Sequence, residues 1–77
     1  MSEIPDTTAS RFHREYVLDE YTLQVYRTRG GAFWWRLVTL TEYGLHTERI
    51  SYKLYDTEAE AISSAVHVYR RIPLVIV

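Results

Sequence analysis

Two alternating stretches of polar and apolar residues, joined by a glycine turn, constrain the fold of this chain most strongly. Residues Tyr21–Thr28 alternate, with Leu23 and Val25 on the same face of the predicted strand. A second alternating stretch follows at Ala32–Thr41, and Arg29-Gly30-Gly31 between them supplies the positive φ angles that a tight hairpin needs. Because a period of two matches the pleat of a β-strand, the pattern predicts an antiparallel hairpin with one buried face.

Trp34 and Trp35 are adjacent in the second of these strands. Neighbouring side chains on a strand point to opposite faces, so one indole is expected in the core and the other on the opposite face. The alternation assigns Trp35 to the core with Phe33 and Leu37, and Trp34 to the open face. A register shift of one residue would exchange the two indoles.

Two further segments are predicted to extend the sheet. Residues Leu45–Tyr55 follow a turn at Glu42-Tyr43-Gly44 and are interpreted as a third strand. The side chains of this strand expected in the core are those of Ile50, Tyr52 and Leu54, with Ser51 and Tyr55 on the opposite face. The segment Arg11–Leu18 fits a strand or a short helix, and we favour a strand because Tyr16-Val17 is β-prone.

The period then changes, and a helix is predicted over about residues 57–71. Thr57-Glu58-Ala59-Glu60 matches a capping box, in which the Thr57 hydroxyl accepts from the Glu60 amide. Acidic residues near its start and Arg70-Arg71 near its end complement the helix dipole, and Pro73 ends it. The apolar stripe expected to face the sheet consists of Ala59, Ile62, Ala65, Val66 and Tyr69.

This order of elements predicts an α+β fold, with a three- to four-stranded antiparallel meander sheet and one C-terminal helix on one face. We expect residues 1–10 to form a flexible N-terminal tail and residues 11–77 to form a single domain, because 77 residues make one domain at most. The apolar ending, Leu74-Val75-Ile76-Val77, predicts either a short final strand at the sheet edge or a homodimer contact.

Composition excludes several classes of protein. The chain has no cysteine, so it has neither a disulfide framework nor a thiolate metal site. No apolar run reaches the roughly 20 residues that span a bilayer, and the polar, acidic N-terminus is unlike a signal peptide. We therefore expect a cytoplasmic protein without a membrane segment.

Catalysis is not expected from the chemistry-bearing residues. His13, His46 and His67 lack the spacing of a metal site, which needs three or four ligands. No Ser-His-acid motif occurs, and no glycine-rich loop joins a strand to a helix. The acidic pair Glu58 and Glu60 is explained by helix capping. The sequence thus predicts no enzyme, no metal and no cofactor.

The open face of the sheet is the predicted binding surface. Its candidate partner-binding residues are Tyr26, Trp34, Arg36, Arg49 and Lys53. Aromatic residues with Arg dominate protein interfaces, and they also hold the bases and phosphates of single-stranded nucleic acids. The net charge of −1 argues against a generic nucleic-acid binder, although residues 21–41 contain Arg27, Arg29 and Arg36 and no acid. Alternatively, the N-terminal segment or a second copy covers this face.

The run Trp35-Arg36-Leu37-Val38, flanked by Gly31 and Gly44 and followed by Tyr55–Ile62, resembles the pattern of the YegP-like small bacterial proteins. The same outline is similar to DNA-binding domains of the ethylene-response-factor type and to the arm-binding domains of tyrosine recombinases. That resemblance implies an aromatic, Arg-bearing sheet face that enters the major groove. In size and kind, the chain resembles phage-encoded accessory proteins, including anti-CRISPR and other anti-defence inhibitors.

Two functions follow as hypotheses. The first is a small non-enzymatic interaction protein that binds and occupies a protein partner, as a phage or mobile-element inhibitor of anti-CRISPR or anti-defence type would. The alternative is a nucleic-acid-binding module that uses the open face of its three-stranded sheet.

Overall fold

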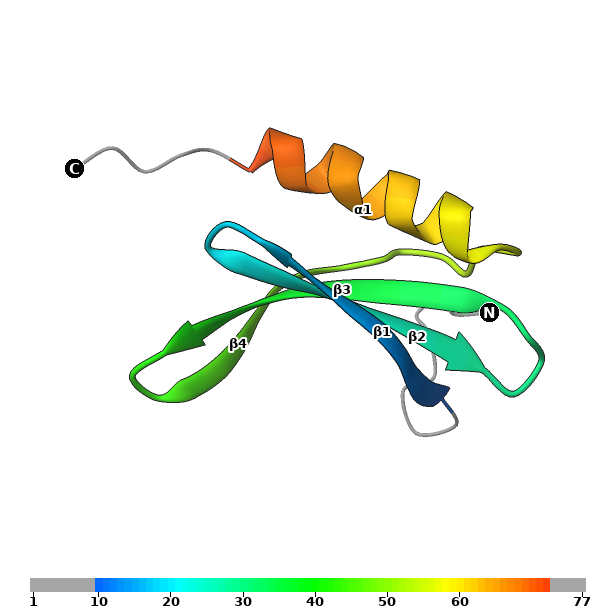
Figure 1. The fold of residues 1–77 in the computed structure, drawn as a ribbon, viewed down its shortest axis with the longest axis horizontal. Coiled ribbons are helices and arrows are strands. Elements are labelled where there is room, and N and C mark those ends of the chain that lie inside the picture. Colours follow the sequence, from blue (N-terminus) through cyan, green and yellow to red (C-terminus); the bar gives the residue numbers. More distant parts are fainter. Residues whose placement is uncertain (1–9, 73–77) are drawn as a thin grey trace.

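The computed structural model describes residues 10–72, which form one antiparallel sheet and one helix (Figure 1). The elements are β1 (Ser10–Leu18), β2 (Tyr21–Thr28), β3 (Phe33–Thr41), β4 (Gly44–Ile50) and α1 (Glu58–Arg71). The four strands lie in the order β1-β2-β3-β4, so the predicted α+β meander and the predicted strand at 11–18 are confirmed. The predicted tail at 1–10, except Ser10, and the predicted role of Leu74–Val77 lie outside the described residues.

The turns occur at residues that tolerate a left-handed backbone. Gly31 has φ of +87° and Gly44 has φ of +112°, which confirms both predicted glycine turns. Asp19, between β1 and β2, has φ of +51°, a conformation that Asp adopts more readily than most residues. Its carboxylate accepts a hydrogen bond from the Tyr69 hydroxyl, so this turn is tied to the last part of α1.

The helix begins at the predicted cap. The Glu60 backbone N–H donates to the Thr57 hydroxyl oxygen at 3.1 Å, and that hydroxyl donates to the Glu60 carboxylate at 3.0 Å. At the other end, the Ile72 N–H donates to the Tyr69 carbonyl. The predicted helix and its capping residue are therefore confirmed.

The core lies between α1 and one face of β2 and β3 (Figure 1). Its buried members are Leu23, Val25, Trp35, Leu37, Tyr55, Ala61 and Ala65. The predicted helical stripe was wrong in part, because Ala59 is exposed and Ala61 takes the buried position. Buried and partly buried residues at 61, 65, 68 and 72 form the line of contact, so two alanines let the helix lie close to the sheet.

A β-bulge in β4 overturns the predicted faces of the third strand. Val38 pairs with Thr47, but Leu37 pairs with Arg49, so Glu48 is the extra residue. Without this bulge, Trp35 would pair with Ile50, and Ile50 would lie on the core face, as the alternation predicted. Because one inserted residue moves every later side chain to the other face, Ile50 pairs with Arg36 and is 42% exposed.

The strand also ends earlier than predicted, at Ile50. Ser51 is buried and forms two hydrogen bonds with the Trp35 backbone. Its N–H donates to the Trp35 carbonyl, and its hydroxyl accepts from the Trp35 N–H. Two of the residues predicted to be in the core, Tyr52 and Leu54, are exposed instead. Tyr55, predicted on the open face, packs in the core, and its hydroxyl lies 2.6 Å from that of Ser64.

The sheet thus has a helix-covered face and a second face, here called the outer face, which is turned away from α1 (Figure 1). Within residues 10–72, no helix has the length and apolar character needed to cross a membrane.

Candidate functional site

The strand register orders the outer face into rows across the sheet. Phe12, Tyr26 and Trp34 make an aromatic row. Glu15, Gln24, Arg36 and Ile50 make a mainly polar row beside it. Aliphatic side chains dominate the end of the sheet next to the β3–β4 turn. One row there consists of Val17, Thr22, Val38 and Thr47, and the pair Leu40 and Leu45 lies beyond it. The outer face therefore has chemically different ends.

Three of the predicted site residues, Tyr26, Trp34 and Arg36, do meet on the outer face. The Tyr26 ring stacks on the Trp34 indole, with centroids 4.4 Å apart and 10° between the planes. The Arg36 guanidinium lies 5.3 Å from the Tyr26 centroid, and its Nε donates to Gln24 Oε1 at 2.8 Å. The Tyr26 hydroxyl donates to the same oxygen at 3.2 Å. The cluster is held by hydrogen bonding and by cation–π attraction.

Trp34 is on the predicted face, but it is not the exposed platform that the sequence predicted. Only 1% of the residue is exposed, the same as for Trp35 in the core. Its indole N–H donates to the Ser10 hydroxyl at 2.8 Å, and Tyr26 stacks on its ring. Trp34 consequently supports the outer face from within and offers little surface to a partner.

The exposed part of the outer face is aliphatic. Leu40 and Leu45 are cross-strand partners at the end of the β3–β4 hairpin, and they are 77% and 66% exposed. Val17 is exposed at the same end of the sheet, and Tyr43 is exposed in the turn that joins β3 to β4. Figure 1 shows this hairpin extending away from α1. Sequence reasoning did not include these residues in the candidate site. The signal that could have found them is that Leu40 and Leu45 are apolar residues on either side of the predicted turn at 42–44.

The remaining two predicted site residues, Arg49 and Lys53, do not join the cluster. The bulge puts Arg49 opposite Leu37, on the face that β3 turns toward α1, and its guanidinium bonds to the Glu48 carboxylate at 2.9 Å. Lys53 lies beyond the end of β4, with its ammonium 5.1 Å from the centroid of the core residue Tyr55. The predicted convergence of five residues on one face was therefore wrong for these two.

A group of polar side chains joins β1 to the start of α1. The Glu58 carboxylate lies 3.3 Å from His13 Nε2 and 3.6 Å from Arg14 Nε, and it accepts a hydrogen bond from the Tyr16 hydroxyl. Partial burial acts to raise the pKa of this carboxyl, but hydrogen bonds from His13 and Tyr16 and the charge of Arg14 outweigh it and hold the pKa below its usual range. His13 also packs edge-on against Phe33.

Among residues 10–72, no group of three or more His, Cys, Asp or Glu side chains could hold a metal ion.

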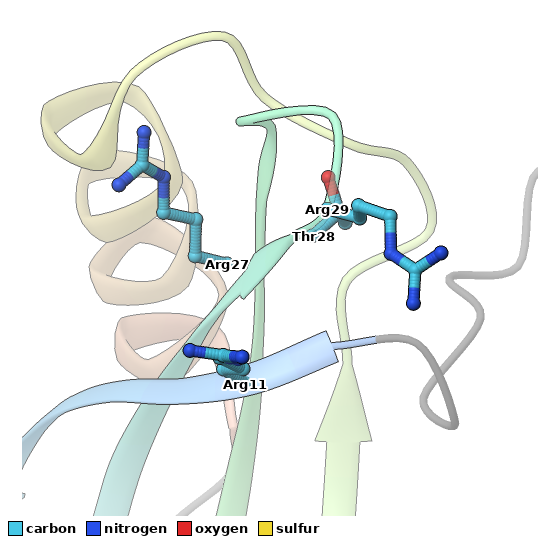
Figure 2. Close-up of a pocket in the computed structure, with 4 residues that line it drawn as sticks. All are labelled: Arg11, Arg27, Thr28 and Arg29. Atoms are coloured by element: carbon cyan, nitrogen blue, oxygen red, sulfur yellow. The ribbon is translucent and has the colours of Figure 1, made fainter.

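Arginines surround an open depression of about 420 Å³ at the end of the sheet next to the β2–β3 turn (Figure 2). We call this the basic end, and its lining residues are Arg11, Arg27, Thr28 and Arg29. Arg11 and Arg27 are directly opposite each other on β1 and β2. The acid-free stretch at 21–41 signalled this charge in the sequence, but the contribution of Arg11 depends on the pairing of β1 with β2.

No protein-family model, curated protein or solved structure matches this chain.

Proposed function

We propose that this chain binds a protein partner through the aliphatic end of its outer face and acts by occupying that partner, without catalysing a reaction. The observation that carries the proposal is the exposed pair Leu40 and Leu45, with Tyr43 exposed in the adjoining turn and Val17 exposed at the same end of the sheet. Large apolar side chains gathered at one place on a small protein mark interaction surfaces. Full burial of each leucine would contribute roughly 1.5–3 kcal/mol to a complex.

The polar row next to this end supports the same partner class. Arg36 and Tyr26 are residue types that often contribute most to protein interfaces. Here Gln24 accepts hydrogen bonds from both, so their side chains are already ordered before a partner arrives. Side chains that are ordered beforehand lose less entropy on binding, which favours affinity.

The outer face is less suited to the alternative function, binding of nucleic acid. Among the strand residues described on that face, Arg36 is the one basic side chain, and it is engaged with Gln24 and Tyr26. Binding of single strands needs cations along the backbone and exposed rings on which bases stack. Trp34 does not offer such a ring, because it is buried, and Phe12 is the exposed ring of the aromatic row.

An inhibitor of phage or mobile-element type is the biological role that we attach to this proposal. It rests on the resemblance in size and kind to anti-CRISPR and other anti-defence proteins, which work by occupying a macromolecule. A compact sheet with one apolar end needs no catalytic group for such a role.

Site-specific photo-crosslinking in the natural host tests the proposal. A photoreactive phenylalanine at position 40 should form a covalent adduct with one protein, and the same group at Ser63, exposed on α1, should not. Calorimetry with the purified partner should then show that Leu40→Asp weakens binding at least tenfold, which corresponds to about 1.4 kcal/mol.

The matched control for the charge is Ser63→Asp, which should leave the affinity unchanged. Equal binding by both variants would contradict the proposed surface. Sedimentation of the isolated chain provides a further check, because a monomer–dimer equilibrium abolished by Leu45→Asp would identify a second copy, and not a different protein, as the occupant.

A further inference from the structure

We propose that the basic end is a second binding site, which takes the phosphate groups of a single-stranded nucleic acid. The site goes beyond the proposed function, because it lies at the opposite end of β2 and β3 from the exposed leucines. Its residues come from β1, β2 and the turn that follows β2.

The first argument is that the arginines of the basic end repel one another and so do not stabilise the fold. Arg11 and Arg27 are cross-strand partners, and like charges directly opposite each other destabilise a sheet. Two other strand arginines have acidic neighbours: Arg14 lies 3.6 Å from Glu58, and Arg49 lies 2.9 Å from Glu48. Arg36 instead donates to Gln24. Among the described residues, no carboxylate forms an ion pair with the arginines of the basic end. An anionic ligand would supply the missing charge.

The second argument is that Arg27 and the turn that carries Arg29 are held in place. The Arg27 guanidinium lies 5.8 Å from the centroid of the Phe33 ring, within the range of a cation–π contact. The turn that carries Arg29 is closed by hydrogen bonds between Thr28 and Ala32, from the Thr28 N–H to the Ala32 carbonyl and from the Ala32 N–H to the Thr28 hydroxyl. The depression of about 420 Å³ is therefore lined by two arginines of an ordered hairpin and by Arg11 of the neighbouring strand.

The spread of the arginines selects a ligand with several phosphates. Figure 2 shows Arg11 and Arg27 pointing to one side of the ribbon and Arg29 to the other. A phosphodiester chain carries its charges in series, so it can cross the end of the sheet and contact guanidinium groups on both sides (Figure 2). Guanidinium groups bind phosphate oxygens with paired hydrogen bonds.

An exposed aromatic ring favours single strands over duplexes. Phe12 follows Arg11 in β1 and is 54% exposed, with its ring edge-on to Tyr26 at 5.7 Å. Neighbouring residues of a strand point to opposite faces, so Phe12 lies on the outer face and Arg11 and Arg27 on the other. An unpaired base can stack on Phe12 while phosphates further along the same strand, past the end of the sheet, contact these arginines. The bases of a duplex are stacked on one another and do not present a free face.

Fluorescence anisotropy of a labelled 15-nucleotide oligothymidylate tests the proposal with the full chain. If three arginines contact phosphates, the logarithm of the affinity should fall with the logarithm of the salt concentration with a slope of about −2. The double variant Arg11→Gln/Arg27→Gln should reduce this slope to about −0.7. Phe12→Ala should weaken binding about tenfold, as expected for the loss of one stacked base.

The matched control is Arg70→Gln/Arg71→Gln, which removes the same charge from the exposed end of α1 and should keep the wild-type slope. Thermal denaturation separates a binding role from a structural one, because the loss of the Arg11–Arg27 repulsion should leave the melting temperature unchanged or raise it. The proposal would be overturned if the two double variants had equal slopes, or if a duplex of the same length bound more tightly than the single strand. It would also be overturned if inorganic phosphate, at matched ionic strength, displaced the labelled strand as well as an unlabelled single strand does. None of these outcomes depends on the leucine surface, so the two proposals can fail separately.

Discussion

Trp34 and Trp35 are adjacent in β3 and equally buried, yet the two faces of the sheet hold them differently. Trp35 packs among Leu23, Val25 and the alanines of α1, and its indole N–H has no hydrogen-bond partner among the described residues. Trp34 stacks on Tyr26 and donates to the Ser10 hydroxyl. The helix-covered face thus relies on apolar packing, whereas the outer face combines ring stacking with hydrogen bonds. Low exposure by itself does not identify which face forms the core.

The largest expected effect comes from truncating each indole in turn. Trp35→Ala should cost about 3–5 kcal/mol, because a cavity between α1 and the sheet cannot close without moving both. That is a large part of the roughly 4–12 kcal/mol expected for a domain of this size. Trp34→Ala should cost less, about 2 kcal/mol, because outer-face side chains such as Tyr26 have room to relax into the gap. Urea denaturation followed by circular dichroism measures both values, and equal losses would remove the distinction between the faces.

A smaller effect is expected from filling the contact between α1 and the sheet. Ala61 is fully buried in the core, so Ala61→Leu should overpack the helix-covered face and cost about 1–3 kcal/mol. Ala59 is exposed on the same helix, and Ala59→Leu should change the free energy of unfolding by less than about 0.5 kcal/mol. The same denaturation experiment compares them. A larger loss for Ala59→Leu would mean that α1 packs through the stripe that the sequence predicted.

The smallest expected effect is a pH dependence that links β1 to α1. Because the pKa of Glu58 is lower in the folded chain than in the unfolded one, the unfolded state binds more protons between the two values, and stability rises with pH there. The contribution of Glu58 is therefore complete above the unfolded pKa of about 4.3 and is lost as the pH falls through the folded pKa. Melting temperatures measured from about pH 7 to pH 3 should fall less for Glu58→Gln than for the wild type.

Glu42→Gln is the control for this measurement, because Glu42 is exposed in the β3–β4 turn and no hydrogen bond or ion pair is found for it among the described residues. It should keep the wild-type pH dependence. If Glu58→Gln does the same, the contacts of Glu58 with His13, Arg14 and Tyr16 do not contribute to stability.

Local signals predicted most of the fold correctly. The alternation at Tyr21–Thr28, the glycines at 31 and 44, and the capping threonine each carry information within a few residues, and each corresponds to an observed strand, turn or helix start. The candidate site was predicted less well, because it required residues from different strands to share a face. Tyr26, Trp34 and Arg36 were correctly grouped since β2 and β3 pair without a bulge.

The errors have one main physical source. The bulge at Glu48 reverses the faces of the residues that follow it, so Arg49 leaves the predicted site and Ile50 joins the outer face. No local pattern distinguishes Glu48 as an inserted residue, because a bulge depends on how two strands fit each other. The proximity of Arg11 to Arg27 at the basic end likewise depends on the pairing of β1 with β2.

The sequence by itself determined the order of the elements, the type of every element after the first, the helix cap, the turns, and that Trp34 and Trp35 lie on opposite faces of one strand. These features depend on backbone preferences and on a period of two or of 3.6, which act over short stretches of chain. Only the tertiary structure decided that Trp34 is buried, that Leu40 and Leu45 are exposed together, and that the basic end exists. Burial and charge proximity are properties of several strands at once, and they depend on register and packing between segments far apart in the chain.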